Sequence, residues 1–207
     1  MSIKIRNANV KDAPFLAKMI LQSSRAGKKD GMFDIAFEMN DDKKILEKLE
    51  MLVQTQAKNY THFSNFLVAE MDGRSVGSLC SYEPRIATKE QFIVALREVG
   101  CSDEANERLD AYYSCEFNLN NRTLMFDFME EEADSVDVGV LKALMQKSLL
   151  SARLKGYRIA QTIIEIGSLE AELFYKKLGL HVVEQKECEQ YKEKFGRAGL
   201  MLMAIEF

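Results

Sequence analysis

Residues 173–180 read LFYKKLGL and lie in the last third of the chain, which is its most informative part. Apolar side chains recur there at helical spacing up to Leu178, and Gly179 follows as a residue that favours the end of a helix. The pattern predicts a short helix over residues 169–178, with Tyr175 on its apolar face.

Regular elements are predicted on both sides of this helix. Apolar residues at intervals of three and four predict a preceding helix that begins at Gly139 and stops near residue 156. Strands are expected in the last third of the chain at residues 123–129, at 160–166, from 181 onward and at 200–206.

The first third of the chain is expected to contribute strands and helices to the same sheet. A strand at residues 3–6 precedes a helix that ends near Gly27, and a second helix opens at Asp41. The Asp72-Gly73 pair between two apolar runs predicts a tight hairpin, because both residues tolerate positive φ. Residues 27–40 are expected to form an ordered loop with a short helix, and residues 84–122 an inserted helical pair without a core of its own.

Length, composition and charge limit the classes of protein. The chain has 207 residues, 47% hydrophobic and 29% charged, so we expect a single packed domain over residues 1–207. A net charge of -4 argues against nucleic-acid binding, which favours a basic face. No apolar run approaches the roughly 20 residues that span a bilayer, and the opening MSIKIRNANVKD lacks the apolar core of a signal peptide. We therefore expect no membrane association and a cytoplasmic protein.

The cysteines and histidines give no pattern of a metal site. Cysteines stand at positions 80, 101, 115 and 188 with no CxxC pair, and His62 lies far from His181 in sequence. The spacing predicts four reduced, mostly buried thiols and no bound metal.

The closing run, the preceding glycine-led helix and the Asp72-Gly73 hairpin together resemble the GNAT acetyltransferase superfamily. The resemblance is loose over residues 1–83, tighter over 123–187, and absent from the insertion. It implies an α/β (α+β) fold: a mixed, mostly antiparallel sheet flanked by helices, with the helical insertion between strands 3 and 4. It further implies that the fourth and fifth strands splay apart and that acetyl-CoA binds as cosubstrate in the gap.

The resemblance also assigns the cofactor-binding residues. Backbone amides at the turn that opens the glycine-led helix would hold the pyrophosphate, since helix N-termini attract anions. Applied to this sequence, the cofactor-binding positions are Val138, Gly139, Val140, Leu141, Lys142 and Ser168.

This phosphate-binding turn departs from the family pattern. Val136 stands where the family has glutamine or arginine, and Leu141 where it has a small residue, so only Gly139 is kept. The approach to the turn is acidic and has no basic residue from Thr123 until Lys142; its carboxylates are those of Glu130, Glu131, Glu132, Asp134 and Asp137. Unless those carboxylates point away, we expect weak CoA affinity, because like charges repel.

The catalytic candidates are Tyr175, Glu130 and Glu131. The resemblance implies that Tyr175 protonates the departing thiolate; packing in the core is its alternative role. A protonated amine must lose a proton before it attacks, so a carboxylate base is expected. Glu130 and Glu131 are strand neighbours on opposite faces, so at most one faces the substrate; the alternative is a solvated acidic turn.

Two functions remain open. The first is an acetyl-CoA-dependent N-acetyltransferase that acts on a primary amine by direct attack on the thioester. Its acceptor would be a small-molecule or peptide amine, and a cationic one because the site is acidic. The alternative is a catalytically degenerate GNAT-like binding or regulatory module, which Leu141 and the acidic turn favour. A homodimer is compatible with either.

Overall fold

The computed structural model describes residues 2–119, 123–135 and 139–207, and these contain a seven-stranded mixed sheet in the order β1-β2-β3-β4-β5-β7-β6. The pairing of β4 with β5 is parallel and the other pairings are antiparallel. The strands are β1 Lys4–Asn7, β2 Phe66–Met71, β3 Arg74–Tyr82, β4 Leu124–Glu131, β5 Ile159–Glu165, β6 His181–Glu187 and β7 Gly199–Glu206. The predicted fold class is confirmed.

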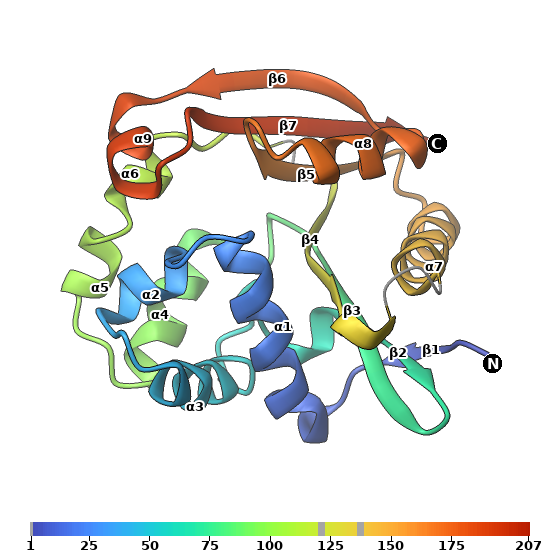
Figure 1. Cartoon of the computed structure of the whole chain (residues 1–207), viewed down its shortest axis with the longest axis horizontal. Coiled ribbons are helices and arrows are strands. Elements are labelled where there is room, and N and C mark those ends of the chain that lie inside the picture. Colours follow the sequence, from blue (N-terminus) through green and yellow to red (C-terminus); the bar gives the residue numbers. More distant parts are fainter. Residues whose placement is uncertain (1, 120–122, 136–138) are drawn as a thin grey trace.

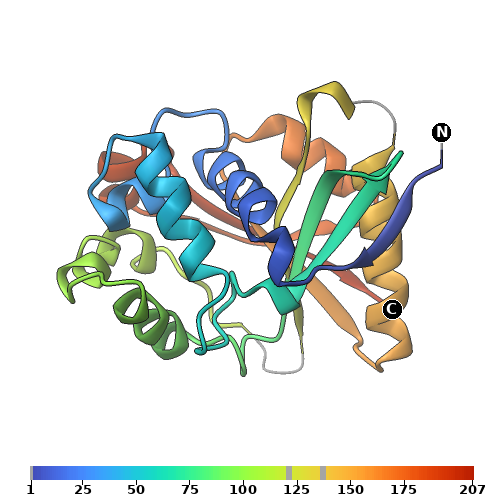
Figure 2. The same ribbon diagram turned by 90° about the horizontal axis from the view of Figure 1, so that it is seen from below.

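Helices cover both faces of the sheet (Figure 2). The α-helices are α1 Ala13–Arg25, α2 Met32–Phe37, α3 Asp42–Leu52, α4 Lys89–Glu98, α5 Glu104–Glu107, α6 Asp110–Tyr113, α7 Val140–Leu154, α8 Leu169–Lys177 and α9 Glu189–Phe195. Helix α7 packs on β2, β3 and β4 with its buried Val140, Leu144 and Met145. Helix α1 packs on the opposite face of β3 and β4 and against α3, so the sheet separates two apolar clusters.

The hairpin and the short helix within residues 27–40 form as the sequence predicts. Asp72 and Gly73 both adopt positive φ, at 51° and 79°, and join β2 to β3. This conformation matches the right-handed twist of the two strands. The hairpin places β3 beside β4, which is the strand that forms one wall of the site described below.

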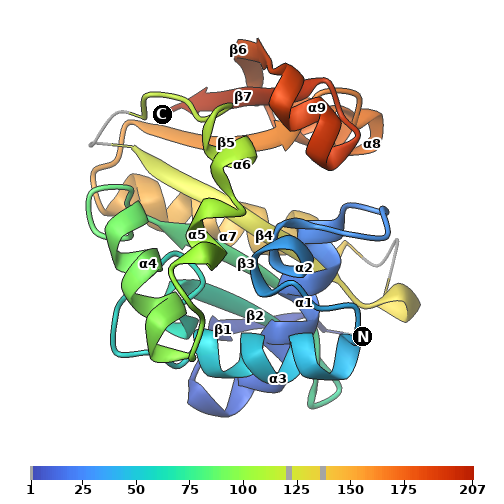
Figure 3. The ribbon, with the colours of Figure 1, turned by 90° about the vertical axis from the view of Figure 1, so that its left-hand side faces the viewer.

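The described part of the insertion, up to residue 119, contains one regular helix and two short ones rather than a helical pair (Figure 3). Helix α4 is capped by Thr88, whose hydroxyl accepts from the backbone N–H of Gln91 at 3.3 Å. Its buried Phe92 and Leu96 join the apolar cluster that α1 and α3 form on the sheet. The insertion therefore completes a shared core, as expected for a segment too short to bury one alone.

The central parallel pairing is short, and this creates a gap within the sheet. Strands β4 and β5 pair at only three positions, which end at Phe126 opposite Thr162. Beyond this point the two halves of the sheet diverge (Figure 1). The predicted separation of the fourth and fifth strands is confirmed.

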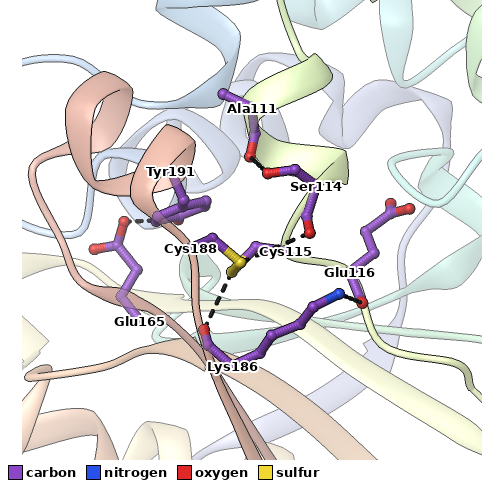
Figure 4. Close-up of a disulfide and its surroundings, with 8 residues drawn as sticks. All are labelled: Ala111, Ser114, Cys115, Glu116, Glu165, Lys186, Cys188 and Tyr191. Carbon is purple, nitrogen blue, oxygen red and sulfur yellow. Dashed lines mark hydrogen bonds between the residues drawn. A yellow bond between two sulfur atoms is a disulfide. The ribbon is translucent and has the colours of Figure 1, made fainter.

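The structure corrects the prediction of four reduced thiols. Cys115, after α6, and Cys188, before α9, form a disulfide, whereas Cys80 and Cys101 are free (Figure 4). The two cysteines are 73 residues apart, so no local pattern in the sequence indicated the pair. The fold brings their Cα atoms to 5.9 Å, a distance that a disulfide can span.

Helix α9 was also missing from the sequence prediction. It ends at Gly196, which has a positive φ of 72°. Among the described residues, no helix combines the length and apolar character that a membrane crossing requires.

Candidate functional site

A cavity of about 1040 Å³ begins where β4 and β5 separate. Its walls come from the ends of these two strands, the start of α8, the end of α1 and the insertion. The volume is at the upper end of the usual range for ligand pockets, which is consistent with room for two reactants. The cavity contains both the gap in the sheet and a chamber beneath the insertion.

A bulge in β4 determines which acidic side chains reach this cavity. Cys80 pairs with Asp127 and Ser78 with Glu130, so β4 has one residue more than β3 over this interval. Phe128, inside the bulge, has a φ of 43°, which is uncommon for a residue other than glycine. Residues three apart in a regular strand face opposite sides, but the extra residue lets Asp127 and Glu130 line the same cavity.

Asp127 was not identified from the sequence. Its Oδ1 accepts the backbone N–H of Phe128 at 2.8 Å. Burial raises the pKa of Asp127 to about 6, and this hydrogen bond opposes the rise. No sequence signal separated it from the other acids of the segment, because its orientation depends on the bulge.

Glu130 and Glu131 are placed differently, as expected for neighbours in a strand. Glu130 lines the cavity and its Oε2 accepts from the side-chain amide of Gln22 at 2.8 Å, whereas Glu131 is not part of the lining. Burial raises the pKa of Glu130 to about 7; Gln22 opposes the rise and the charge of Glu131 adds to it. A carboxyl group with such a pKa exchanges protons readily near neutral pH.

Tyr175 is buried at the cavity wall on α8. Burial raises the pKa of its phenol to about 12, and a hydrogen bond with the Thr162 hydroxyl opposes that rise. The phenol therefore keeps its proton at neutral pH. Its partner Thr162 is also the last β5 residue paired with β4, so the phenol lies beside the opening of the gap.

The N-terminus of α7 follows the gap along the chain. Gly139 is its N-cap with a φ of 86°, and no described atom lies within 4 Å of where a Cβ would stand. Leu141 packs against the apolar cluster under α7, and Lys142 is exposed. Val138 lies outside the described residues, and so does Val136. The first amides of this helix are donors without acceptors in their own helix.

The acidic approach to α7 is partly neutralised by the first half of the chain. Lys18 Nζ lies 2.6 Å from a Glu132 carboxylate oxygen, and an Arg74 guanidinium nitrogen 2.7 Å from a carboxylate oxygen of Asp134. Two of the carboxylates that were expected to weaken CoA binding therefore have basic partners. These ion pairs reduce the expected repulsion of a phosphate.

Ser168 is the N-cap of α8 and lines the cavity without making a side-chain capping bond. Its neighbour in space, Glu165, is held by Lys28 and accepts a hydrogen bond from the Tyr191 hydroxyl at 2.9 Å (Figure 4). Within the described part of the chain, no three His, Cys, Asp or Glu side chains are grouped as metal ligands.

Solved structures share this architecture. The N-acetyltransferase from Staphylococcus aureus Mu50 superposes with a TM-score of 0.72 at 17% identity, covering 98% of this chain and 100% of that one. The chain has the fold of the GNAT acetyltransferases. The PaiA N-acetyltransferase from Thermoplasma acidophilum, solved in complex with coenzyme A, has a TM-score of 0.57 at 14% identity and full coverage of both chains.

A third example of the GNAT fold is the ribosomal-protein-alanine N-acetyltransferase from Brucella melitensis, with a TM-score of 0.59, 16% identity and 99% coverage of each chain. No protein-family profile and no curated protein matches the sequence.

Proposed function

We propose that the protein is an N-acetyltransferase that transfers an acetyl group from acetyl-CoA to a primary amine. The observation that carries this proposal is the separation of β4 from β5 beside a large cavity that Tyr175 and Glu130 both line. We further propose a single domain over residues 1–207, with the insertion forming the acceptor side.

The described residues are compatible with acetyl-CoA. Past Phe126 and Thr162, the facing edges of β4 and β5 no longer pair with each other, which leaves backbone groups for the amides of a pantetheine arm. The α7 amides after Gly139 suit an anionic pyrophosphate, and Ser168 offers a hydroxyl at the cavity wall. Acetyl-CoA supplies the acyl group as a thioester.

The side chains then divide the proton transfers between them. Glu130 accepts the proton that the ammonium must lose, so that the neutral amine attacks the thioester carbon directly and the carbon–sulfur bond breaks. Tyr175 donates its phenolic proton to the departing thiolate, and the resulting phenolate takes up the proton that the acylated nitrogen loses as the amide forms. Burial raises the pKa of the phenol, and an apolar site also raises that of a thiol, so the two remain comparable acids there. Glu131, outside the lining, has no part in this scheme.

The test separates binding from chemistry. Acetyl-CoA at about 100 times its Kd should stabilise the protein by about 2.7 kcal/mol in thermal unfolding. Tyr175→Phe should then lower kcat at least tenfold and leave this stabilisation unchanged, because the phenol acts on the leaving group.

Absence of any shift at millimolar acetyl-CoA would refute the enzyme proposal and favour the catalytically degenerate binding module. Equal losses of turnover and of acetyl-CoA affinity in Tyr175→Phe would assign this residue to packing.

A further inference from the structure

The chamber beneath the insertion has a wall of aromatic rings. The Tyr60 ring lies against that of Phe92 in a tilted arrangement, with centroids 4.5 Å apart, and its centroid is 5.9 Å from that of Tyr82. Tyr112 and Tyr113 of α6 add an edge-to-face pair at 6.0 Å, and all five rings line the cavity. These residues come from four separate segments, so the aromatic wall is a product of the fold.

One ammonium already occupies the face of a ring in this wall. The Nζ of Lys89 lies 3.3 Å from the centroid of the Tyr113 ring. Aromatic faces attract cations through their quadrupole, most strongly where water is excluded. Although Lys89 is exposed, the contact shows that a tyrosine ring lining the cavity holds a primary ammonium on its face.

Asp127 is a half-buried carboxylate that lines the same cavity. In the described part of the chain no lysine, arginine or histidine forms an ion pair with it, and its one hydrogen bond comes from the Phe128 amide. Burial raises the pKa of Tyr60 and of Tyr82, and the negative charge of Asp127 adds to both rises, which places it close to this wall. A carboxylate that is partly removed from water and lacks a countercharge is costly, and a cationic ligand would supply that countercharge.

The other acids of the cavity have partners or lie at its rim. Glu165 pairs with Lys28 and Arg197, and Glu130 is held by Gln22. Glu116 and Glu170 are exposed. Apart from Glu130, the proposed base, whose partner Gln22 is neutral, Asp127 is therefore the one carboxylate inside the cavity without a cationic partner among the described residues. This arrangement suits one positive charge rather than a row of them.

We propose that the acceptor is a small primary amine with a single ammonium on an aromatic or other apolar body, bound with the ammonium at Asp127 and the body against the tyrosine wall. The proposal rests on the transferase activity proposed above and specifies its substrate class. Asp127 acts here as the binding group, distinct from Glu130, the proposed base.

The disulfide supports the same chamber. Cys115 follows α6, which carries Tyr112 and Tyr113, and its partner Cys188 precedes α9 (Figure 4). The Tyr112 ring lies 6.2 Å from that of Tyr191 on α9. The covalent bond thus holds the aromatic wall against the opposite side of the cavity, as expected for a pocket formed before its ligand binds.

Binding can be tested without the cosubstrate, which separates this proposal from the previous one. Calorimetry at pH 8 should show that 2-phenylethylamine binds at least tenfold more tightly than 2-phenylethanol, its neutral counterpart of the same shape. Asp127→Asn should abolish this preference. Asp110→Asn, an exposed acid of the insertion outside the cavity lining, should retain it.

Equal binding of the amine and the alcohol by the unaltered protein would overturn the proposal, and this comparison needs no variant that must fold. Release of the CoA thiol should also have a kcat/KM at least tenfold higher with 2-phenylethylamine than with spermidine or trialanine. A preference for spermidine or for the peptide would refute the single-charge, apolar acceptor and leave the transferase proposal intact. Failure of acetyl-CoA to stabilise the protein would refute the transferase proposal. The calorimetry would still show whether the chamber prefers the amine to the alcohol.

Discussion

Replacing the disulfide in the variant Cys115→Ser/Cys188→Ser should cost the protein a large share of its stability. The bond closes a loop of 73 residues, and the chain-entropy relation gives about 4 kcal/mol for a loop of this length at 25 °C. Contacts between α6 and α9 remain in the variant, including the Tyr112 and Phe195 rings at 6.2 Å. We therefore expect a loss of about 2–4 kcal/mol, which lies within the range of about 2–5 kcal/mol typical of native disulfides.

The assay is urea unfolding of the oxidised protein, of the same protein after reduction, and of the double variant. The free and half-buried Cys101 supplies the control, and Cys101→Ser should change the free energy of unfolding by less than about 1 kcal/mol. Alkylation without reductant should label two thiols of the unfolded protein instead of four. If reduction left the urea midpoint unchanged, or if all four thiols were labelled, the disulfide would not be a structural feature in solution.

Three further substitutions test the proposed site. The pKa of Glu130 is raised to about 7, so activity should rise with pH through about 7, and the variant Glu130→Gln should lose this dependence. The folded state holds this proton up to about pH 7, whereas the unfolded state releases it near pH 4.5. The free energy of unfolding should therefore fall between these pH values in the parent and fall less in the variant, as urea midpoints would show. Leu141→Gly should tighten CoA binding if the turn otherwise fits, but destabilise the fold because Leu141 packs on the cluster under α7; calorimetry and thermal unfolding separate the two effects. Gly77→Ala should weaken acetyl-CoA binding, because the new Cβ would lie 2.6 Å from Cγ1 of Val140 and would displace the start of α7. Unchanged affinity would place the cofactor elsewhere.

Local sequence patterns were sufficient to predict most of the fold. The Asp72-Gly73 turn and the apolar periodicity of α7 and α8 each express a preference of neighbouring residues, and the structure bears these elements out. The separation of the fourth and fifth strands came from the family resemblance rather than from any such preference. It is nevertheless present at the expected place.

The parts that sequence reasoning missed depend on distant contacts. The side chain of Asp127 faces the cavity because β4 has one extra residue relative to its neighbour β3. No local sequence pattern indicates this extra residue at Phe128. The pairing of Cys115 with Cys188 likewise requires α6 and α9 to meet. Helix α9 did leave a local signal, since Tyr191, Phe195 and Gly196 have the spacing of a short capped helix.

The short seam between β4 and β5 has a consequence for how the chain folds. Strands β1–β4 pair in sequence order, and β5, β6 and β7 pair among themselves without help from the first half. The strand pairs within each half therefore form without this seam, and the halves are joined by three residue pairs of the sheet and by two apolar clusters that contain residues of both. Amide hydrogens at the seam should exchange with deuterium before those in the middle of either half, and an arm bound between the strands should slow them.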